Sequence, residues 1–328
     1  MPSIEVSDLA RMRRELLFDG PDRARKLSRF WMLLTLAAII ATAGVISDST
    51  ATVIGAMIVA PLMTPILGTV LSIVTADRAN LLRSLAMVAG GAALVVAIAW
   101  LLGHVYPMPI VAATSSQIAG RIHPRLIDLV AALATGTVGA FALVRDDVGD
   151  TLPGVAIAIS LVPPLAVVGL TLESGASGEA AGASLLFLAN VTAILASGIV
   201  VMGLYQVQRT ALDVGGPRRS VGRAGAAVVV AILVLLVAVP LWTTSIGVIQ
   251  DTLAESRVSA VADDWASTAD WDVVSVESRD GAVVVRAVGP LPAPTPEDLR
   301  RALDDAGVTD TDVRLELVPE QRVDLPAG

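Results

Sequence analysis

The sequence contains no cysteine, which removes disulfide bonds, thiolate nucleophiles and zinc–thiolate sites from consideration. It contains only two histidines, His104 and His123, so a metal site built from several histidines is excluded as well. Charged residues make up only 16% of the chain, whereas 54% of the residues are apolar. A water-soluble globule of this size is not expected from such a composition, and lipid is the expected solvent for most of the chain.

Seven apolar stretches are long enough to cross a membrane. A hydrocarbon core of about 30 Å needs roughly 20 mostly apolar residues in a helix. The predicted spans cover residues 30–47, 51–74, 82–104, 126–144, 151–172, 181–205 and 224–246. We therefore expect a mainly α-helical, polytopic membrane protein with an N-terminal arm at 1–29 and a loop at 206–223 before the final helix.

The basic residues predict the orientation of these spans. Seven of them precede the first span: Arg11, Arg13, Arg14, Arg23, Arg25, Lys26 and Arg29. Because cytoplasmic segments carry an excess of Arg and Lys, the N-terminus is expected in the cytoplasm of a multi-pass protein of the cell membrane. Seven spans then place residues 247–328 outside. The loop that holds Arg121 and Arg125 would also lie outside, which does not fit the distribution of basic residues. If 51–74 and 151–172 re-enter the membrane instead of crossing it, the loop with Arg121 and Arg125 is cytoplasmic. This alternative stays open.

Two stretches of the chain align with each other at an offset of 99 residues. They are VIGAMIVAPLMTPILGTVLSI and LPGVAIAISLVPPLAVVGLTL. The alignment pairs Gly55 with Gly154, Pro65 with Pro164 and Asp48 with Asp147. Each copy holds three spans, in residues 30–124 and 125–205, and an odd number of spans makes the two copies inverted. Broken helices at matching positions of inverted repeats point to a transporter-type site near the membrane midplane.

Prolines interrupt the middle helix of each copy. Because proline lacks an N–H and clashes with the carbonyl four residues earlier, the prolines should free four backbone carbonyls, those of Met57, Pro61, Ile159 and Ser160. In hydrocarbon such groups persist only where protein, water or a ligand satisfies them. The predicted pathway for a small solute or ion consists of Met57, Pro61, Thr64, Pro65, Ile159, Ser160, Pro163, Pro164 and the mid-span Asn190. A kink that merely helps helices pack, with Asn190 bonding to a neighbouring helix, is the alternative.

Four charged residues near the span ends are candidates for a gate or for structural roles: Asp48, Arg121, Asp128 and Asp147. Asp48 and Asp147 precede the broken helices, where capping of free N–H groups is the plain explanation. Asp128 follows Arg121 and Arg125, so a salt bridge at the membrane surface is its plain explanation. No metal site, cofactor or nucleic acid is expected.

Residues 247–328 predict a small soluble α/β domain that is strongly acidic. From residue 250 to the end there are 17 acidic and 7 basic residues. A helix is expected at 247–267 and strands at 271–277, 282–288 and 311–318, with the Asp280-Gly281 pair as a hairpin turn. Thr295 and Pro296 start a second helix, which Gly307 ends. The expected order is αββαβ.

Four motifs of the membrane region resemble one family. They are IGAMIVAPLMTPILG, GRIHPRLIDLVAALATGTVGA, LPGVAIAISLVPPLAVVGL and LLFLANVTAI, and together they span roughly residues 30–205. In this respect the chain is similar to the bacterial and archaeal membrane proteins called domain of unknown function family 389. The resemblance implies a multi-spanning membrane protein and implies no activity. It marks as family positions Gly55, Pro61, Pro65, Arg121, Pro124, Asp128, Gly136, Pro153, Gly154, Pro163, Pro164 and Asn190.

Two functions remain open for this sequence. The first is a membrane transporter or channel for a small solute or ion, and the absence of a deep acidic or basic residue favours a channel or a sodium-type carbonyl site over a proton antiporter. The second is a non-transporting sensor or scaffold whose outer domain binds a partner. An enzyme is not expected, because no nucleotide loop, activated nucleophile or metal cluster is visible. Small residues on the spans make a homo-oligomer plausible.

Overall fold

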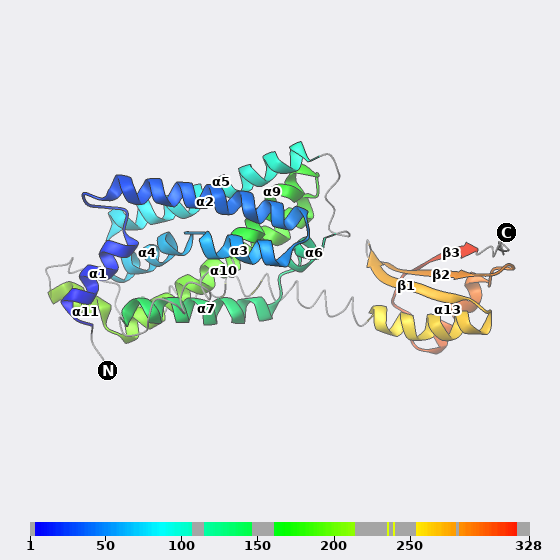
Figure 1. Ribbon diagram of the computed structural model, residues 1–328. Helices are drawn as coiled ribbons and strands as arrows, with labels where there is room; N and C mark the ends of the chain where they lie inside the picture. The colour runs from blue at the N-terminus through cyan, green and yellow to red at the C-terminus, as the bar shows by residue number, and fades with distance from the viewer. Residues whose placement is uncertain are drawn as a thin grey trace. The chain divides into compact units, whose positions relative to one another are not determined.

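The computed structural model describes residues 4–106, 115–145, 161–213, 254–279 and 282–319, together with Leu235 and Val239. The chain divides into two compact units, Met1–Ser245 and Ile246–Gly328. In its described part the first unit is helical (Figure 1). Its helices are α1 (Val6–Leu16), α2 (Arg23–Ile46), α3 (Thr50–Val59), α4 (Met63–Val74), α5 (Arg78–Val105), α6 (Ser116–Ile122), α7 (Leu126–Val144), α9 (Val162–Glu173), α10 (Ser177–Leu204) and α11 (Val207–Asp213).

Four helices of the first unit, α2, α5, α7 and α10, are long and apolar enough to cross a membrane. The pair α3 and α4 passes the same test as one span that is bent by 46°, which makes five candidate spans. Helix α9 is a shorter apolar helix. The chain is therefore a multi-pass membrane protein. The predicted span 224–246, and residues 151–160 of the fifth predicted span, lie outside the described residues apart from Leu235 and Val239.

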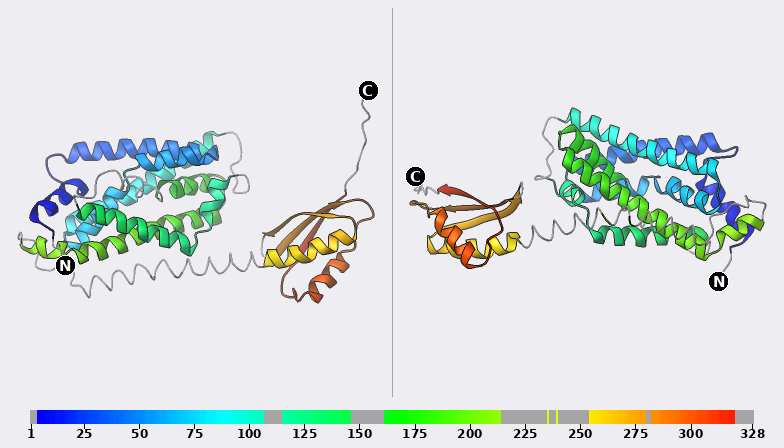
Figure 2. Two further views of the ribbon diagram at one scale, coloured as in Figure 1. Left: turned by 60° about the horizontal axis from the view of Figure 1, so that its bottom comes forward. Right: turned by 180° about the vertical axis from the view of Figure 1, so that it is seen from behind.

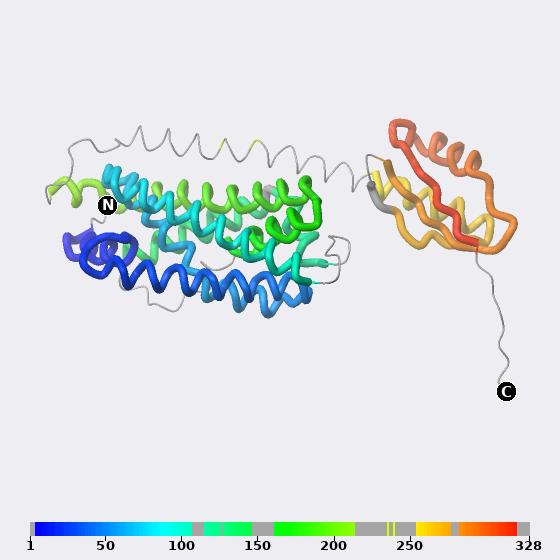
Figure 3. The backbone as a smooth tube through the Cα atoms, turned by 90° about the horizontal axis from the view of Figure 1, so that it is seen from above, coloured from blue at the N-terminus to red at the C-terminus, as the bar shows by residue number. Residues whose placement is uncertain are grey.

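Helix α10 is the most buried candidate span, and it is the long green helix of Figure 3. It packs against α4, α7 and α9. Both α4 and α9 contact the same two long helices, α5 and α10. The two shorter helices, α4 and α9, are therefore packed between the long helices α5 and α10.

Glycines allow the long and short helices to approach closely. A Cβ atom on Gly169 of α9 would stand 2.5 Å from the Ala99 Cβ and 2.9 Å from the Trp100 nitrogen of α5. A Cβ atom on Gly136 of α7 would stand 2.7 Å from the Ile194 Cα of α10. Since real Cβ atoms do not approach other heavy atoms this closely, small residues at these two crossings set the distance between the helices.

The N-terminal arm folds back onto the bundle. Leu9, Met12 and Leu16 form the buried face of α1, and α1 packs against α4, α7 and α11. The Arg13 guanidinium lies 3.3 Å from a carboxylate oxygen of Asp77 in the α4–α5 connection. The predicted arm 1–29 is thus partly a packed amphipathic helix and not only a charged lead.

In its described part, residues 254–279 and 282–319, the second unit has a three-stranded sheet and two helices (Figure 2). Helix 254–268 is followed by β1 (Asp272–Arg279), β2 (Ala282–Gly289), α13 (Pro296–Asp305) and β3 (Val313–Pro319). The strand order is β1-β2-β3, with β1 antiparallel and β3 parallel to β2.

The small C-terminal α/β region and its element order are confirmed within the described residues. Its core includes Trp265, Trp271, Val285 and Leu303. Gly307 has a φ of 76° directly after α13, which is a left-handed conformation that glycine adopts without strain. The predicted Asp280-Gly281 turn lies outside the described residues.

Candidate functional site: a cavity at the α3–α4 break

Pro61 produces the break between α3 and α4. The residue before a proline is driven to extended geometry, and Ala60 has φ −69° and ψ 126°. Helix α3 therefore ends at Val59, and α4 starts again at Met63 with a bend of 46°. The predicted break in residues 51–74 is thus confirmed.

One of the carbonyls expected to be free at this break is not free. The Pro61 carbonyl accepts a hydrogen bond from the Thr64 N–H at 3.2 Å. That bond closes a tight turn at the start of α4, so the chain compensates locally for the N–H that Pro65 lacks. The expectation of a free carbonyl at Pro61 was therefore wrong.

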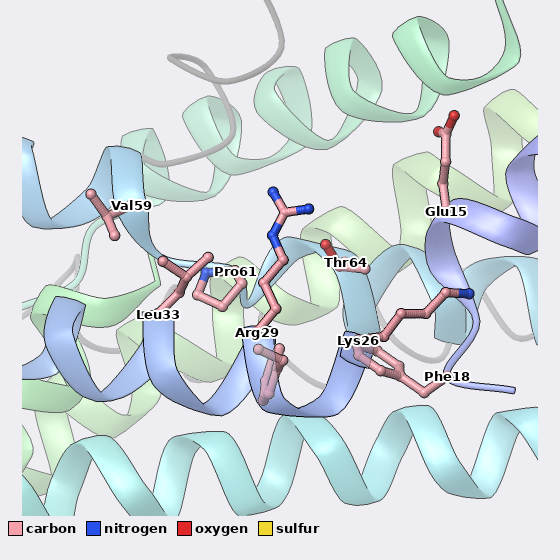
Figure 4. A pocket seen from close by; sticks show the side chains of 9 residues that line it. Glu15, Phe18, Lys26, Arg29, Leu33, Val59, Pro61 and Thr64 are labelled. Atoms are coloured by element: carbon pink, nitrogen blue, oxygen red, sulfur yellow. The ribbon is translucent and has the colours of Figure 1, made fainter. Parts of the chain in front are cut away.

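A cavity of about 310 Å³ lies at the break. Residues from α1, α2, α3, α4 and the intervening connections line it: Glu15, Phe18, Lys26, Arg29, Phe30, Leu33, Val59, Pro61 and Thr64. One part of the lining is aromatic and aliphatic, and the other part carries charged side chains. Figure 4 shows the Arg29 side chain extending from α2 toward the break, with its guanidinium between Pro61 and Thr64 in that view.

The charged residues of the cavity differ in how their charge is balanced. The Lys26 ammonium donates to the carbonyl oxygens of Arg14 at 2.6 Å and Leu17 at 2.9 Å, at the C-terminal end of α1. Glu15 lies 3.8 Å from the Arg11 guanidinium. Arg29 makes no hydrogen bond or ion pair with any residue in the described ranges. Neither cation has an ion-pair partner among the described residues, but the donors of Lys26 are used by carbonyl oxygens and those of Arg29 are not.

The predicted pathway residues do not all meet at this cavity. Pro61 and Thr64 line it, whereas Met57 and Pro65 are buried in the bundle nearby and do not. Pro163 and Pro164 stand in the first turn of α9, where proline is well tolerated, and both are buried. Asn190 is 3% exposed on α10. Ile159, Ser160 and Asp147 lie outside the described residues.

Asp48 connects the α2–α3 loop to α6. Its carboxylate accepts hydrogen bonds from the Gln117 N–H at 3.0 Å and from the hydroxyls of Ser115 and Ser116 at 3.2 and 3.0 Å. The Gln117 bond, followed by the Ser116 bond, holds the pKa of Asp48 below its usual value. Asp48 therefore caps α6, about 70 residues further along the chain, while Ser49 caps the helix that directly follows it.

Arg121 and Asp128 do not form the expected salt bridge within the described residues. Asp128 accepts the backbone N–H of Arg125 at 2.7 Å, at the start of α7. Arg121 donates to the Gln117 carbonyl at 2.6 Å and to the Gln117 side-chain oxygen at 3.1 Å, and burial lowers its pKa. Each charge satisfies its own helix end, because the short connection between α6 and α7 directs the two side chains to different partners.

Sequence reasoning did not place Glu15, Lys26 and Arg29 at the site. These residues were assigned to a charged arm that precedes the first span. One signal could have identified Arg29: it is the last charged residue of α2, and residues 30–46 contain none. An arginine that directly precedes an apolar run has a long side chain, which can extend toward a break in the neighbouring helix.

Part of the membrane unit is similar to a known family. Residues 57–196 match the family described as Domain of unknown function (DUF389). The chain is also similar to the uncharacterized protein MJ0678 of Methanocaldococcus jannaschii, with 34% identity over 204 residues. That match covers 62% of this chain and 62% of the length of the relative. No solved structure matches the chain. The segment that matches the DUF389 family, residues 57–196, includes α4, α5, α7, α9 and most of α10.

Proposed function

We propose that this protein is a membrane transporter or channel for a small solute or ion, with its pathway at the two proline-broken helices. The observation that carries the proposal is the cavity at Pro61. A span that is bent only for packing would be filled by neighbouring side chains, whereas this break opens onto about 310 Å³ that is lined in part by charged groups. That volume lies at the lower end of the range for small-molecule pockets, about 300 to 1,000 Å³.

The packing of α4 and α9 supports an inverted repeat. Each of them carries proline in its first turn, Pro65 in α4 and Pro163 in α9, and each contacts both α5 and α10. Two helices related by a pseudo-twofold axis would have this shared pair of neighbours, since α5 and α10 are the third helices of the two copies. In the proposed arrangement there are seven spans, the N-terminus is cytoplasmic, residues 247–328 are extracytoplasmic, and the protein forms a homo-oligomer.

Flux measurements on the purified full chain in liposomes test this function. Liposomes loaded with small anions, cations and neutral metabolites should release one class of solute faster when the protein is present. Pro61→Ala restores the missing N–H and allows α3 and α4 to straighten, so it should lower that flux by about tenfold or more, which corresponds to about 1.4 kcal/mol in the barrier. Pro296→Ala, in the exposed first turn of α13, is the matched control and should leave flux unchanged.

Two results would contradict the transport function. One is equal leakage from liposomes with and without the protein for every solute class. The other is full flux from Pro61→Ala. The first result would favour the alternative in which the spans anchor residues 247–328 as a sensor or scaffold.

A further inference from the structure

We infer that the cavity at the α3–α4 break binds an anionic group of the phosphate or carboxylate class, with Arg29 as its principal ligand. Glu15 contributes the one negative side chain of the lining, and Lys26 and Arg29 contribute two positive ones. Arg11, which lies 3.8 Å from Glu15, further reduces the effect of that carboxylate. The lining therefore favours an anion over a cation.

The chemistry of Arg29 specifies the class of anion. A guanidinium presents several N–H donors in a planar fork, which matches the paired oxygens of a carboxylate or a phosphate. Lys26 is held by two carbonyl oxygens at the end of α1, so it contributes fixed positive charge from one side. Arg29 has no partner among the described residues, so its donors remain available to a ligand.

Thr64 provides a second polar group in the lining of the cavity. Its hydroxyl makes no hydrogen bond within the described ranges, and its backbone N–H already closes the turn with Pro61. Thr64 lies at the N-terminal end of α4, where the helix dipole adds positive potential. An anion between Arg29 and Thr64 would therefore meet a guanidinium, a hydroxyl and the positive end of a helix.

The apolar part of the lining allows two sources for this anionic group. Leu33, Val59 and Phe30 line the same cavity, and Arg29 stands where α2 changes from charged to apolar. Arg29 is exposed in the described structure, so a ligand can reach its guanidinium from outside the bundle. A free small anion or the headgroup of an anionic phospholipid would supply the pairing charge. If the anion is the solute that moves, the inference rests on the transport function proposed above.

Anion binding is measured on the full chain in a neutral detergent, with inorganic phosphate as the probe. Phosphate should bind saturably, and Arg29→Gln should raise its Kd by about tenfold or more, because a charge-assisted bidentate contact is lost. Arg25→Gln removes the same charge from a position of the same helix that does not line the cavity, where Arg25 pairs with Asp22, and should leave the Kd unchanged. Equal thermal unfolding of the two variants without phosphate shows that both are folded.

Lipid retention separates the two sources. The same variants are placed in nanodiscs of phosphatidylcholine with 20–30 mol% phosphatidylglycerol, roughly the charge density that attracts basic segments, and retained lipid is measured by native mass spectrometry. Loss of retained phosphatidylglycerol in Arg29→Gln supports a headgroup, and unchanged retention with weakened phosphate binding supports a free anion. The inference is overturned if neither probe distinguishes Arg29→Gln from Arg25→Gln.

The binding and flux results fail in distinguishable ways. Arg29-dependent anion binding without flux for any solute leaves the site in place and removes the transport function. Flux that is abolished by Pro61→Ala but unaffected by Arg29→Gln leaves the pathway in place and removes the anion site.

Discussion

Disruption of the α5–α9 crossing should lower the free energy of unfolding. Gly169 stands at this crossing, and Gly169→Ala would place a Cβ atom 2.5 Å from the Ala99 Cβ. Carbon atoms that are not bonded pack best at about 3.5–4.0 Å, so the two helices would have to separate by about 1 Å. Two of the three nearest atoms belong to the α5 backbone and cannot rotate away as a side chain could.

Two opposing effects determine how much Gly169→Ala changes the free energy of unfolding. Overpacking a close contact costs about 1–3 kcal/mol, and replacing glycine by alanine inside a helix regains up to about 1 kcal/mol. We expect Gly169→Ala to lower the free energy of unfolding by about 1–2 kcal/mol. Gly55 of α3 has no neighbouring atom within 4 Å of an added Cβ, so Gly55→Ala should be neutral or stabilising by up to about 1 kcal/mol.

Unfolding of the full chain in mixed micelles, with an increasing fraction of a denaturing detergent, measures both variants. The two variants differ from the wild type by one methyl group each, so their opposite signs isolate the effect of the crossing. If Gly169→Ala is as stable as Gly55→Ala, α9 and α5 do not cross as closely as described.

Two further predictions concern the ends of the spans and the second unit. Asp48→Asn retains the positive φ of 49° and hydrogen-bond acceptance but does not titrate. Because the folded-state pKa of Asp48 is below its usual 3.8, its ionised form stabilises the fold above about pH 4, and that contribution is lost as the pH falls through the folded-state pKa. The unfolding temperature of the wild type should therefore exceed that of Asp48→Asn at pH 7, and the two temperatures should converge below that pKa. A difference in unfolding temperature that does not change with pH would exclude the capping role. Leu303→Ala, at a side chain that is 1% exposed, should cost about 2–5 kcal/mol and raise hydrogen exchange across 254–319, whereas Leu291→Ala, at 74% exposure, should not; equal exchange in both would contradict the described core.

Local patterns predicted the elements of this protein well. The lengths of the apolar runs correspond to α2, α5, α7 and α10, because a helix that faces lipid must be apolar over a full membrane thickness. Pro61 marked the bend between α3 and α4, because the missing N–H acts on its own turn. In the second unit, Pro296 and Gly307 marked the ends of α13, since a helix start and stop also depend on adjacent residues.

Contacts between distant residues were not predictable in the same way. Asp48 was expected to cap a neighbouring helix and instead caps α6, because the positive φ of its loop directs the carboxylate away from α3. Arg121 and Asp128 were expected to pair because they are close in sequence, yet each satisfies groups on its own side of the α6–α7 connection. Such choices depend on where α6 meets the bundle, which no local pattern encodes.

The position of Arg29 shows why the site itself was only half predicted. Pro61 and Thr64 were identified because the break is a property of their own helix, whereas the charge that faces the break comes from α2 and depends on the antiparallel packing of α2 against α3. Sequence reasoning treated the first repeat as a set of freed carbonyls, which would attract cations. The Pro61 carbonyl is bonded to the Thr64 N–H, and a guanidinium without a protein partner in the described ranges faces the cavity instead. The proposed anion site therefore depends on donors that line the break, Arg29 above all, and Arg29 belongs to a different helix from the one that is broken.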